Sequence, residues 1–328
     1  MIVSAMNPPY QITPAILNLV AAIAEKIGRM NAKYLDKPSP QLRKENRIKT
    51  IHSSLSIEGN TLTIEQVTSL LDNKRIIGPK KDVNEVLNAI KLYDQLQDFD
   101  PVAPTSFLLA HQILMKDLVS DNGKYRKSGV GIMAGDRMAH LAPPADQVPY
   151  LMNDLFAYLK NSQESALIKS CVFHYEMEFI HPFVDGNGRM GRFWQTLILM
   201  KEFPIFEFLP FENLIHQTQE AYYLALASSD QIGASTPFIA YMLGVINDTL
   251  SDFLKYKSKV QSTEDRLTYF SEVGFTSFNR KDYMSVFQEI STATASRDLK
   301  KGVEMGLFTK HGDKTKTVYE IVSKINKK

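Results

Sequence analysis

Cysteine is nearly absent from this sequence, which has one, Cys171, among 328 residues. A single cysteine excludes an internal disulfide framework and favours a reducing compartment. Long hydrophobic runs are also missing, because no stretch approaches the roughly 18 uncharged apolar residues that span a membrane. The N-terminus lacks the basic-then-apolar pattern of a secretion signal. We therefore expect a cytoplasmic protein without a membrane partner.

The chain also lacks a strong excess of charge of one sign, since its formal net charge is +2. Apolar and charged contents of 44% and 23% are ordinary for soluble globular proteins. The charge is nevertheless uneven: residues 255–328 carry 15 basic and 9 acidic side chains, a net +6, and the rest carries −4. The polar stretch over residues 255–265 indicates a domain boundary there.

The most informative segment is His181-Pro-Phe-Val-Asp-Gly-Asn-Gly-Arg-Met-Gly-Arg192. Apolar residues at spacings of three and four predict a helix from Ser165 to Ile180, and Pro182 predicts that it ends near His181. Residues 192–201 predict a second helix. The motif is therefore expected to connect two helices, with the imidazole at a helix end.

The glycines and arginines of this connection suit an anion. Gly186 and Gly188 permit positive φ, so that successive backbone N–H groups can form an anion-binding nest at the start of the second helix. Arg189 and Arg192 lie three residues apart and can reach the same anion with planar, bidentate contacts. This composition predicts that a phosphate chain binds here.

Two further side chains add chemistry. Asp185 is a hard oxygen ligand suited to Mg²⁺, and His181 can accept a proton from a hydroxyl. Gly186-x-Gly188-x-x-Gly191 also matches the dinucleotide-binding fingerprint, but a helix rather than a strand is expected before it. A helical turn with incidental glycine and arginine is the other alternative, and it does not explain why so many chemical groups share one turn.

The twelve residues resemble the signature of the Fic family, His-Pro-Phe-x-Asp/Glu-Gly-Asn-Gly-Arg-x-x-Arg, at every fixed position. The resemblance implies a mainly α-helical bundle that transfers AMP from ATP to a Ser, Thr or Tyr hydroxyl of a target protein. It implies that His181 is the catalytic general base, that Phe183 anchors the loop in the core and that Asp185 binds Mg²⁺. The nucleotide-binding residues that it implies are Glu58, Gly186, Asn187, Gly188, Arg189, Met190, Gly191, Arg192 and Tyr222.

A second motif, Ser54-Leu-Ser-Ile-Glu-Gly-Asn60, lies upstream. Apolar residues on one face predict a helix over residues 46–57, which Gly59 would end. Thr63 and Gln66 predict a capping box that opens the next helix. Glu58 is thus expected at the C-terminal end of a helix, where the backbone dipole disfavours a carboxylate unless a cation pairs with it.

Ser54, Glu58 and Gly59 match the Fic inhibitory motif, Ser/Thr-x-x-x-Glu-Gly/Asn. The resemblance implies that Glu58 pairs with Arg192, occupies the γ-phosphate position and inhibits the enzyme, as in the N-terminally inhibited class. Two alternatives stay open. Glu58 is a solvated surface residue, which is the usual case for Glu, or it positions a water for hydrolytic removal of AMP.

Residues 125–144 are the one strand-like segment of the catalytic half. Alternating apolar residues on both sides of a Gly-Asp turn predict a short β-hairpin, whose exposed edge can accept an extended segment by strand addition. The hairpin resembles the Fic flap that docks the target, and an ordinary surface hairpin is the alternative. The expected docking residues are Val130, Gly131, Ile132 and Met133.

Residues 220–226 predict another helix. The resemblance implies that its Tyr222 lines the adenine pocket, although such tyrosines more often belong to the core. Asp230 departs from the Asn of some relatives, which leaves its contact with the nucleotide open. The remaining histidines show no metal-ligand spacing and are expected on the surface or satisfied in the core: His52, His111, His140, His174, His216 and His311.

The basic C-terminal part has its own pattern. Helices over residues 279–289 and 292–305, followed by alternating runs at 306–310 and 317–322, resemble a winged helix. The second helix is expected to turn outward Ser296, Arg297, Lys300 and Lys301. The wing would present to phosphates Lys310, Lys314 and Lys316. DNA binding through residues 265–328 and docking of a protein are both open.

Together these patterns predict a mainly α protein with three parts. They are an N-terminal helical region over residues 1–100 with an inhibitory helix at about 46–58, a Fic catalytic core over 101–255, and a winged helix-turn-helix domain over 265–328. The expected activity is Mg²⁺-dependent AMP transfer from ATP to an unidentified target or to the chain itself. The alternatives are a de-AMPylating hydrolase with the same site and a nucleotide-sensing DNA-binding regulator. A homodimer is left open.

Overall fold

The structure is a computed structural model that describes residues 8–33, 40–129, 131–134, 137–259, 263–273, 275–287, 290–312 and 317–322. The chain divides into two compact units. Unit 1 consists of Met1–Asn31 and Asn46–Leu250, and unit 2 consists of Ala32–Glu45 and Ser251–Lys328. Among the helices within the described ranges, none combines the length and the apolar character that crossing a membrane requires.

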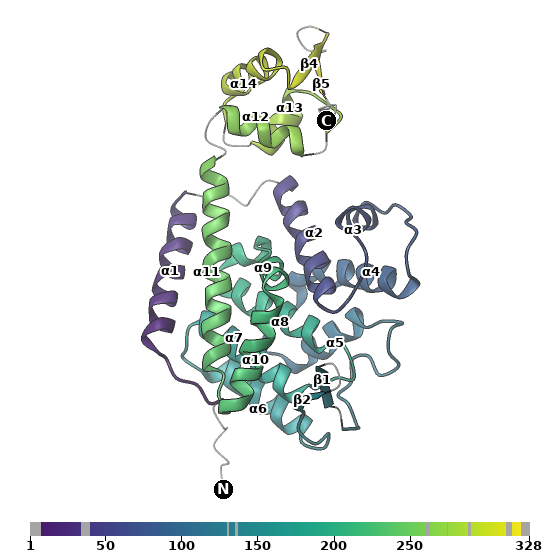
Figure 1. The fold of residues 1–328 in the computed structure, drawn as a ribbon, viewed down its shortest axis with the longest axis vertical. Coiled ribbons are helices and arrows are strands. Elements are labelled where there is room, and N and C mark those ends of the chain that lie inside the picture. The colour runs from purple at the N-terminus through teal and green to yellow at the C-terminus, as the bar shows by residue number, and fades with distance from the viewer. Residues whose placement is uncertain are drawn as a thin grey trace. The chain divides into compact units, whose positions relative to one another are not determined.

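Unit 1 is built almost entirely of helices, as the sequence predicts. The elements that lie wholly or mostly in it are α1 (Pro14–Lys33), α2 (Pro40–Ile57), α3 (Ile64–Leu71), α4 (Lys80–Asp94), η1 (Leu96–Asp98), α5 (Pro104–Leu114), α6 (Val148–Asn161), α7 (Ala166–Ile180), α8 (Asn187–Glu202), η2 (Pro204–Phe208), α9 (Phe211–Gln217), α10 (Gln219–Ile232) and α11 (Thr236–Lys259). Helices α7 and α8 pack against each other inside this unit, with most of their residues buried (Figure 1). A helix that is apolar on all sides is expected in such a position.

An aromatic cluster fills the space between α5, α6, α7 and α8. The ring of Phe107 lies between 5.0 and 6.1 Å from the rings of Phe156, Phe173, Phe183 and Trp194. Aromatic side chains bury large apolar areas and so dominate the energetics of such a core. Because Phe183 belongs to the twelve-residue motif and is 0% exposed, the cluster anchors the loop between α7 and α8, as predicted.

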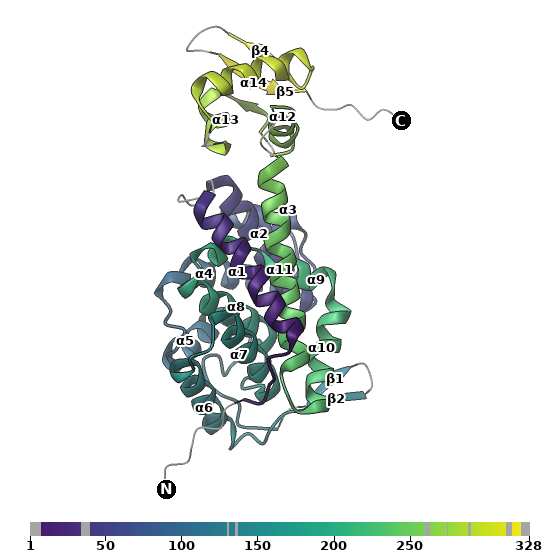
Figure 2. The ribbon, with the colours of Figure 1, turned by 90° about the vertical axis from the view of Figure 1, so that its left-hand side faces the viewer.

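Local signals place several helix ends where the sequence predicts them. Thr63 caps α3, and its side chain and that of Gln66 form both hydrogen bonds of the predicted capping box. Helix α2 ends at Ile57, followed by Gly59 in the left-handed region at φ +86°. Helices α1 and α11 lie side by side (Figures 1 and 2), and Lys26 Nζ donates to Asn247 Oδ1 between them at 2.5 Å.

The predicted β-hairpin is present. Strands β1 (Gly131–Ala134) and β2 (Arg137–Leu141) pair antiparallel, with a bulge between Ile132 and Met133. Strand β2 lies beside α10 (Figure 2). Val130, which the sequence assigns to target docking, lies outside the described residues, as do residues 135–136 of the turn.

Unit 2 contains a small three-stranded sheet. Its elements are α12 (Thr263–Glu272), β3 (Ser277–Phe278), α13 (Arg280–Val286), α14 (Thr292–Glu304), β4 (Phe308–His311) and β5 (Val318–Ile321). The sheet order is β3-β5-β4, and both pairs are antiparallel. The sequence predicts α13 and α14, although α13 ends three residues before the predicted end. It misses α12 and also β3, which is too short for an alternating pattern. This order is compatible with a winged helix, which stays a prediction.

A buried ion pair ties together the helices of unit 2. Asp298, 0% exposed on α14, accepts two hydrogen bonds from Arg266 on α12, at 2.6 and 2.9 Å, and one from the hydroxyl of Tyr283 on α13 at 3.2 Å. Bidentate pairing of this kind compensates for the desolvation of both charges. The apolar core around it includes Phe270, Phe278, Leu299 and Phe308.

Candidate active site

The twelve-residue motif folds into a tight turn between α7 and α8. His181 ends α7 in the left-handed region at φ +51°, and its N–H donates to Met177 O at 2.9 Å. Gly186, at φ +89°, is the cap residue that precedes α8, and the helix itself begins at Asn187. The sequence places the start of this helix at Arg192, so that prediction is wrong by more than one turn: the second half of the motif is helical.

The Asn187 side chain explains why the helix begins so early. Its Oδ1 accepts from Phe183 N, and its Nδ2 donates to Phe183 O, both at 3.0 Å. These two bonds close the loop across residues 183–187 and satisfy backbone groups that water cannot reach. At Gly186, a Cβ atom would lie 2.8 Å from Met115 Sδ, so the turn has no space for a side chain.

His111 on α5 supports the same turn through contacts with Phe183 and Asp185. Its ring stacks on that of Phe183 with centroids 3.6 Å apart. Nδ1 accepts from Gly123 N–H at 2.9 Å, so the proton is on Nε2, which donates to Asp185 O at 3.0 Å. Burial lowers the pKa of His111 to about 4 and keeps the ring neutral. This histidine is satisfied in the core, as predicted, and it holds the backbone beside Asp185.

Arg192 and Glu58 form the predicted pair. Arg192 Nη2 donates to Glu58 Oε1 at 2.7 Å and to Ser54 O at 2.9 Å, and Nε donates to Ser54 Oγ at 3.1 Å. Arg192 is 0% exposed, whereas the Glu58 side chain is 31% exposed. Burial by itself would lower the pKa of the guanidinium, but Glu58, together with Tyr222 and Glu178, outweighs burial and raises that pKa above its usual value.

The Glu58 carboxylate also lies against the first turn of α8. A Cβ atom built on Gly188 would be 2.3 Å from Glu58 Oε1, so only glycine lets the carboxylate approach the helix this closely. The N-terminus of a helix carries a partial positive charge and unpaired N–H groups. Glu58 therefore takes the position at which an anion would be stabilised by α8 and by Arg192 together.

Arg189 turns away from Arg192 to a different partner. Its Nη1 donates to Glu85 Oε1 at 3.0 Å, and its Nη2 donates to Asp185 Oδ1 at 2.8 Å. Both Arg189 and Glu85 on α4 are about 5% exposed or less. Asn60, the last residue of the upstream motif, donates to the other oxygen of Glu85 at 2.8 Å. Glu85 is not among the site residues predicted from the sequence.

Arg126 ties the root of the hairpin to the end of α7. Its guanidinium donates to Ile180 O and His181 O at 3.2 and 2.7 Å, and to Ser128 O and Pro143 O at 2.9 and 2.5 Å. It is 2% exposed. The last carbonyls of a helix have no partner within the helix, and a cation there also suits the helix dipole.

A cavity of about 740 Å³ lies over these groups. The predicted site residues that line it are Glu58, His181, Asp185, Gly186, Asn187, Gly188, Arg192 and Tyr222. Of the others, Met190 is fully buried, Gly191 lies against His174, and Arg189 is engaged with Glu85. Gly131, Ile132 and Met133 belong to strand β1, of which the structure describes the backbone alone.

The part of the cavity wall that contains Tyr222, on α10, is more apolar. Tyr222 is 2% exposed, and its hydroxyl lies 3.2 Å from Nε2 of His174. Burial lowers the pKa of His174 to about 3, so the ring is neutral. Asp230 also lines the cavity and accepts from the Tyr175 hydroxyl at 2.9 Å. Burial and the neighbouring Asp230 raise the pKa of Glu176 to about 7.

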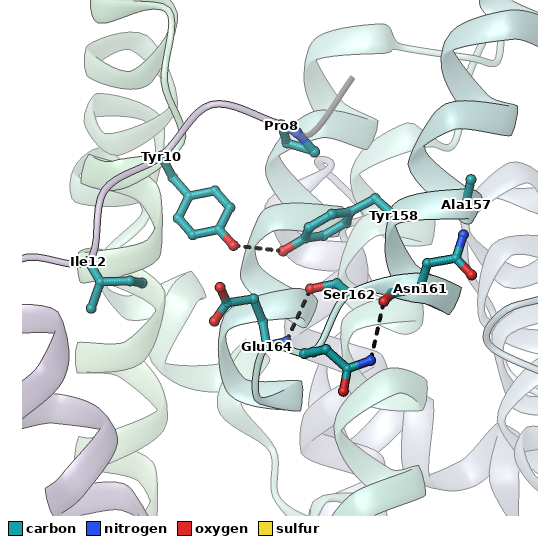
Figure 3. A pocket seen from close by; sticks show the side chains of 9 residues that line it. Pro8, Tyr10, Ile12, Ala157, Tyr158, Asn161, Ser162 and Glu164 are labelled. Atoms are coloured by element: carbon teal, nitrogen blue, oxygen red, sulfur yellow. Dashed lines mark hydrogen bonds between the residues drawn. The ribbon is translucent and has the colours of Figure 1, made fainter. Parts of the chain in front are cut away.

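A second cavity, of about 620 Å³, lies between the segment before α1 and the end of α6. Figure 3 shows the hydroxyls of Tyr10 and Tyr158 facing each other in it, 3.3 Å apart, with the carboxylate of Glu164 close by. Its lining among the described residues includes no arginine, lysine or histidine. It therefore has no cation for a phosphate chain, and the candidate active site is the cavity over α8.

The chain resembles known proteins in both sequence and structure. A model of the Fic/DOC family matches residues 101–199. The crystal structure of a Fic family protein from Desulfovibrio desulfuricans G20 is 42% identical, with a TM-score of 0.74, and the match covers 97% of this chain and 99% of that one. The chain belongs to the Fic family.

Two other comparisons are more distant. The structure of Fic-1 (aa134–508) from C. elegans matches with a TM-score of 0.62 at 19% identity, over 74% of this chain and 73% of that one, which concerns the fold alone. Protein adenylyltransferase Fic from Drosophila melanogaster is 27% identical over 222 residues, or 65% of this chain and 43% of that protein. The corresponding protein from Culex quinquefasciatus is 25% identical, over 76% of this chain and 52% of that protein. The Fic chain described here thus spans about half the length of these curated relatives.

Three residues support the cavity of this Fic chain without lining it, and the sequence did not predict these supporting roles: Glu85, His111 and Arg126. Glu85 had a usable signal, because it precedes Ala89 and Leu92 on one face of α4, and a carboxylate on a buried face requires a cation. His111 and Arg126 had none. Their partners lie far along the chain or in loops, and no spacing rule connects them.

Proposed function

We propose that this Fic protein is a protein adenylyltransferase, which transfers AMP from ATP to a hydroxyl of a target protein and is inhibited by its own Glu58. The observation that carries the proposal is the 2.7 Å ion pair between Glu58 and Arg192, inside the cavity that also contains His181. A carboxylate and a phosphate are both anions that favour a helix N-terminus and an arginine. A site that accepts one is suited to the other.

The triphosphate would bind along the first turn of α8. The backbone N–H of Gly188, in the unpaired first turn of the helix, and the guanidinium of Arg192 are the donors that would bind it. The adenosine would extend toward the apolar wall that contains Tyr222 and Tyr223. Asn187 would contribute its backbone, because its side chain is committed to Phe183. Arg189 would act through Asp185 rather than by direct contact.

His181 would then act as the general base. Its ring takes the proton of the target hydroxyl while the hydroxyl oxygen attacks the α-phosphorus. The new P–O bond forms as the bond to the bridging oxygen of the β-phosphate breaks, and pyrophosphate leaves in line. The product is a phosphodiester between AMP and the target. The chain's main contribution is to orient the reactants and to stabilise negative charge on the phosphates.

Asp185 fits a role as ligand for Mg²⁺. Its Oδ1 accepts from Gly186 N and from Arg189, which orients the carboxylate, and 46% of the side chain is exposed at the cavity. No group of three or more acidic, histidine or cysteine side chains suited to a metal occurs among the described residues. A single carboxylate fits Mg²⁺, which commonly keeps waters and binds substrate phosphates. Bound there, the ion would neutralise phosphate charge.

The proposal is tested by mass spectrometry of cell lysate incubated with Glu58→Gly protein and labelled ATP, UTP or GTP. We expect AMP on hydroxyls of one or a few proteins, with labelling at least tenfold above wild type, because the removal of the carboxylate frees Arg192 for phosphate. The matched control is the Glu58→Gly, His181→Ala double variant, which should label nothing. Equal labelling by wild type and Glu58→Gly would contradict the inhibitory role.

The same proteins distinguish transfer from AMP removal. The Glu58 carboxylate is partly exposed in the cavity, so it has room to hold a water. A hydrolase would release AMP from a pre-modified target and would need Glu58, so Glu58→Gly would abolish that release. We expect the opposite, a gain of transfer in Glu58→Gly.

A second candidate function is DNA binding by unit 2, which one surface favours. Helix α14 exposes Ser296, Arg297 and Lys300 on one face, and Arg280 of α13 donates to Ser296 Oγ at 3.1 Å. Lys301, also predicted to face outward, instead pairs with Glu264 of α12. Basic and hydroxyl side chains on one helix face suit phosphates and base edges.

A further inference from the structure

Glu85 is a buried carboxylate with two separate sets of contacts. Its side chain is 6% exposed on α4, and it carries one hydrogen-bonded partner on each oxygen. Oε1 accepts from Arg189, and Oε2 accepts from Asn60. An exposed third neighbour, Lys81, is 3.9 Å away and contributes little. A buried carboxylate of this kind depends on its partners to remain charged.

The first contact leads to the turn over residues 183–187, just before α8, which is called the phosphate turn because the triphosphate is proposed to bind beside it. Arg189 Nη1 binds Glu85 at 3.0 Å, while its Nη2 binds Asp185 Oδ1 at 2.8 Å. A guanidinium is planar and rigid, so fixing one side of it fixes the other. Glu85 therefore determines the direction in which Arg189 holds Asp185, whose carboxylate is one of those that line the cavity.

The second contact leads to the inhibitory segment. Asn60 follows Glu58 by two residues, and its side chain binds Glu85 at 2.8 Å and Asp82 O at 3.1 Å. Its backbone N–H donates to Leu55 O at 3.1 Å, which closes the end of α2. Glu58 is thus held from two sides. Arg192 binds its carboxylate directly, and Glu85 holds the segment just after Glu58 through Asn60.

We infer that Glu85 is a positioning residue that couples the inhibitory Glu58 to the phosphate turn: through Asn60 it holds Glu58 against Arg192, and through Arg189 it orients Asp185. This inference rests on the proposed function of the cavity. The two contacts separate by mutation. Loss of Asn60 affects only the inhibitory side, whereas loss of the Glu85 charge affects both.

The experiment uses full-length Asn60→Ala and Glu85→Gln proteins, each alone and combined with Glu58→Gly. Rates of labelling by ATP, Mg–ATP affinity by calorimetry and melting temperatures are measured. Asn60→Ala is expected to raise labelling about tenfold when Glu58 is present, from the loss of one hydrogen bond to a charged group, and to have no effect in Glu58→Gly. Glu85→Gln, which keeps the side-chain shape, is expected to raise labelling in the same way when Glu58 is present.

In the Glu58→Gly background the two variants are expected to differ. Glu85→Gln should weaken Mg–ATP affinity about tenfold, because Arg189 loses its charged partner and Asp185 its orientation. Asn60→Ala should bind Mg–ATP as Glu58→Gly does. Lys81→Ala is the matched control, since it removes only the exposed neighbour, and it should change none of these quantities.

A purely structural Glu85 would lower the melting temperature while leaving Mg–ATP affinity unchanged, and that result overturns the inference. Unchanged labelling in Asn60→Ala overturns its inhibitory half and does not depend on how well Glu85→Gln folds. If Glu58→Gly labels no protein but binds Mg–ATP, the proposed transfer fails while calorimetry still tests Glu85. If Glu58→Gly does not bind Mg–ATP, both the proposed function and the inference about Glu85 are overturned.

Discussion

At the scale of single residues, the chemistry of the cavity depends on charges that are buried and individually paired. Arg192 is 0% exposed and remains cationic through Glu58, and Arg189 is held by Glu85 and Asp185. An unpaired buried charge costs several kcal/mol, so each guanidinium requires an anion. A cavity with this property favours an anionic ligand that can take over from a side chain.

The replacement His181→Ala, made in Glu58→Gly protein, is expected to abolish labelling of the target while leaving ATP affinity within about twofold of its parent. The imidazole lies at the cavity end of α7, whereas the phosphate turn is held by contacts of Asn187 and His111. General-base help is worth about 10²–10⁴ in rate. Radioactive ATP and calorimetry check both halves, and a variant that still labels at the parent rate would rule out this role.

A pH dependence of stability follows from His111. Burial lowers its pKa to about 4 in the folded chain, against about 6.5 when unfolded. Because the unfolded state binds the proton more readily, this contribution is complete above pH 6.5 and is lost as the pH falls toward 4. Between pH 7 and pH 5 the wild type should lose about 2 kcal/mol through this group.

Urea unfolding of wild type and His111→Gln at pH 5, 6 and 7 measures that loss. The variant should lose about 2 kcal/mol less than wild type over this interval. Glu212, whose pKa burial raises to about 7, acts in the opposite direction, but it is present in both proteins and cancels in the difference. Parallel pH profiles for the two proteins would contradict the prediction.

At the scale of elements, the site is formed where α7 ends and α8 begins, and its accessory parts are attached to those two ends. The end of α2 contributes Ser54, and the turn directly after it contributes Glu58, to Arg192 on α8. The hairpin is attached to the C-terminal carbonyls of α7 through Arg126. Helix ends have unpaired backbone groups, so they are natural points for such attachments.

Arg126→Lys should lower the rate of the Glu58→Gly enzyme about tenfold and leave its Mg–ATP affinity unchanged. One ammonium cannot reach the four carbonyls that the guanidinium binds, so His181 and the base of the hairpin lose their common anchor. The hydrogen bonds of this side chain within the described residues go to carbonyls outside the phosphate turn. The control Lys127→Ala changes the exposed neighbouring residue and should leave the rate unchanged. An equal fall in the rate of both variants would instead indicate a general effect of charge and contradict the prediction.

At the scale of the whole molecule, the C-terminal residues, which make up most of unit 2, differ in charge from the rest of the chain. Residues 255–328 carry a net +6 and the remainder carries −4. A net charge of this kind promotes association with polyanions without specifying a fold. The alternative functions of the chain are therefore separable: one depends on the cavity of unit 1, the other on an exposed helix face of unit 2.

Full-length protein should shift duplex DNA at low salt, and the affinity should fall steeply as salt rises, because each phosphate contact releases a counterion. The double variant Arg297→Glu, Lys300→Glu reverses two exposed charges on α14 and should abolish the shift. His181→Ala should leave it unchanged. Absence of a shift at the lowest salt would remove DNA binding and leave protein docking as the role of unit 2.

Much of the site follows from local sequence. The end of α7 just before Pro182, the glycine turn and the capping box at Thr63 agree with prediction. The Glu58–Arg192 pair agrees with what the family resemblance implies. The start of α8 does not, because helical periodicity is weak where glycine and polar residues alternate, and the early start depends on the Asn187 side chain. Strand β3 is too short to give an alternating pattern, and pairing with β5 creates it.

The sequence by itself determined the helical class, the connection that contains His181, and the residue types that meet an anion, because caps, turns and periodicity act over a few neighbouring residues. The tertiary structure alone decided that Arg189 turns to Glu85, that Arg126 joins the hairpin to α7, and that His111 supports the turn. Arg126 and His181 lie 55 residues apart along the chain, and Glu85 and Arg189 lie 104 residues apart. Side chains so distant meet only when the helices pack, and burial then makes each pairing obligatory.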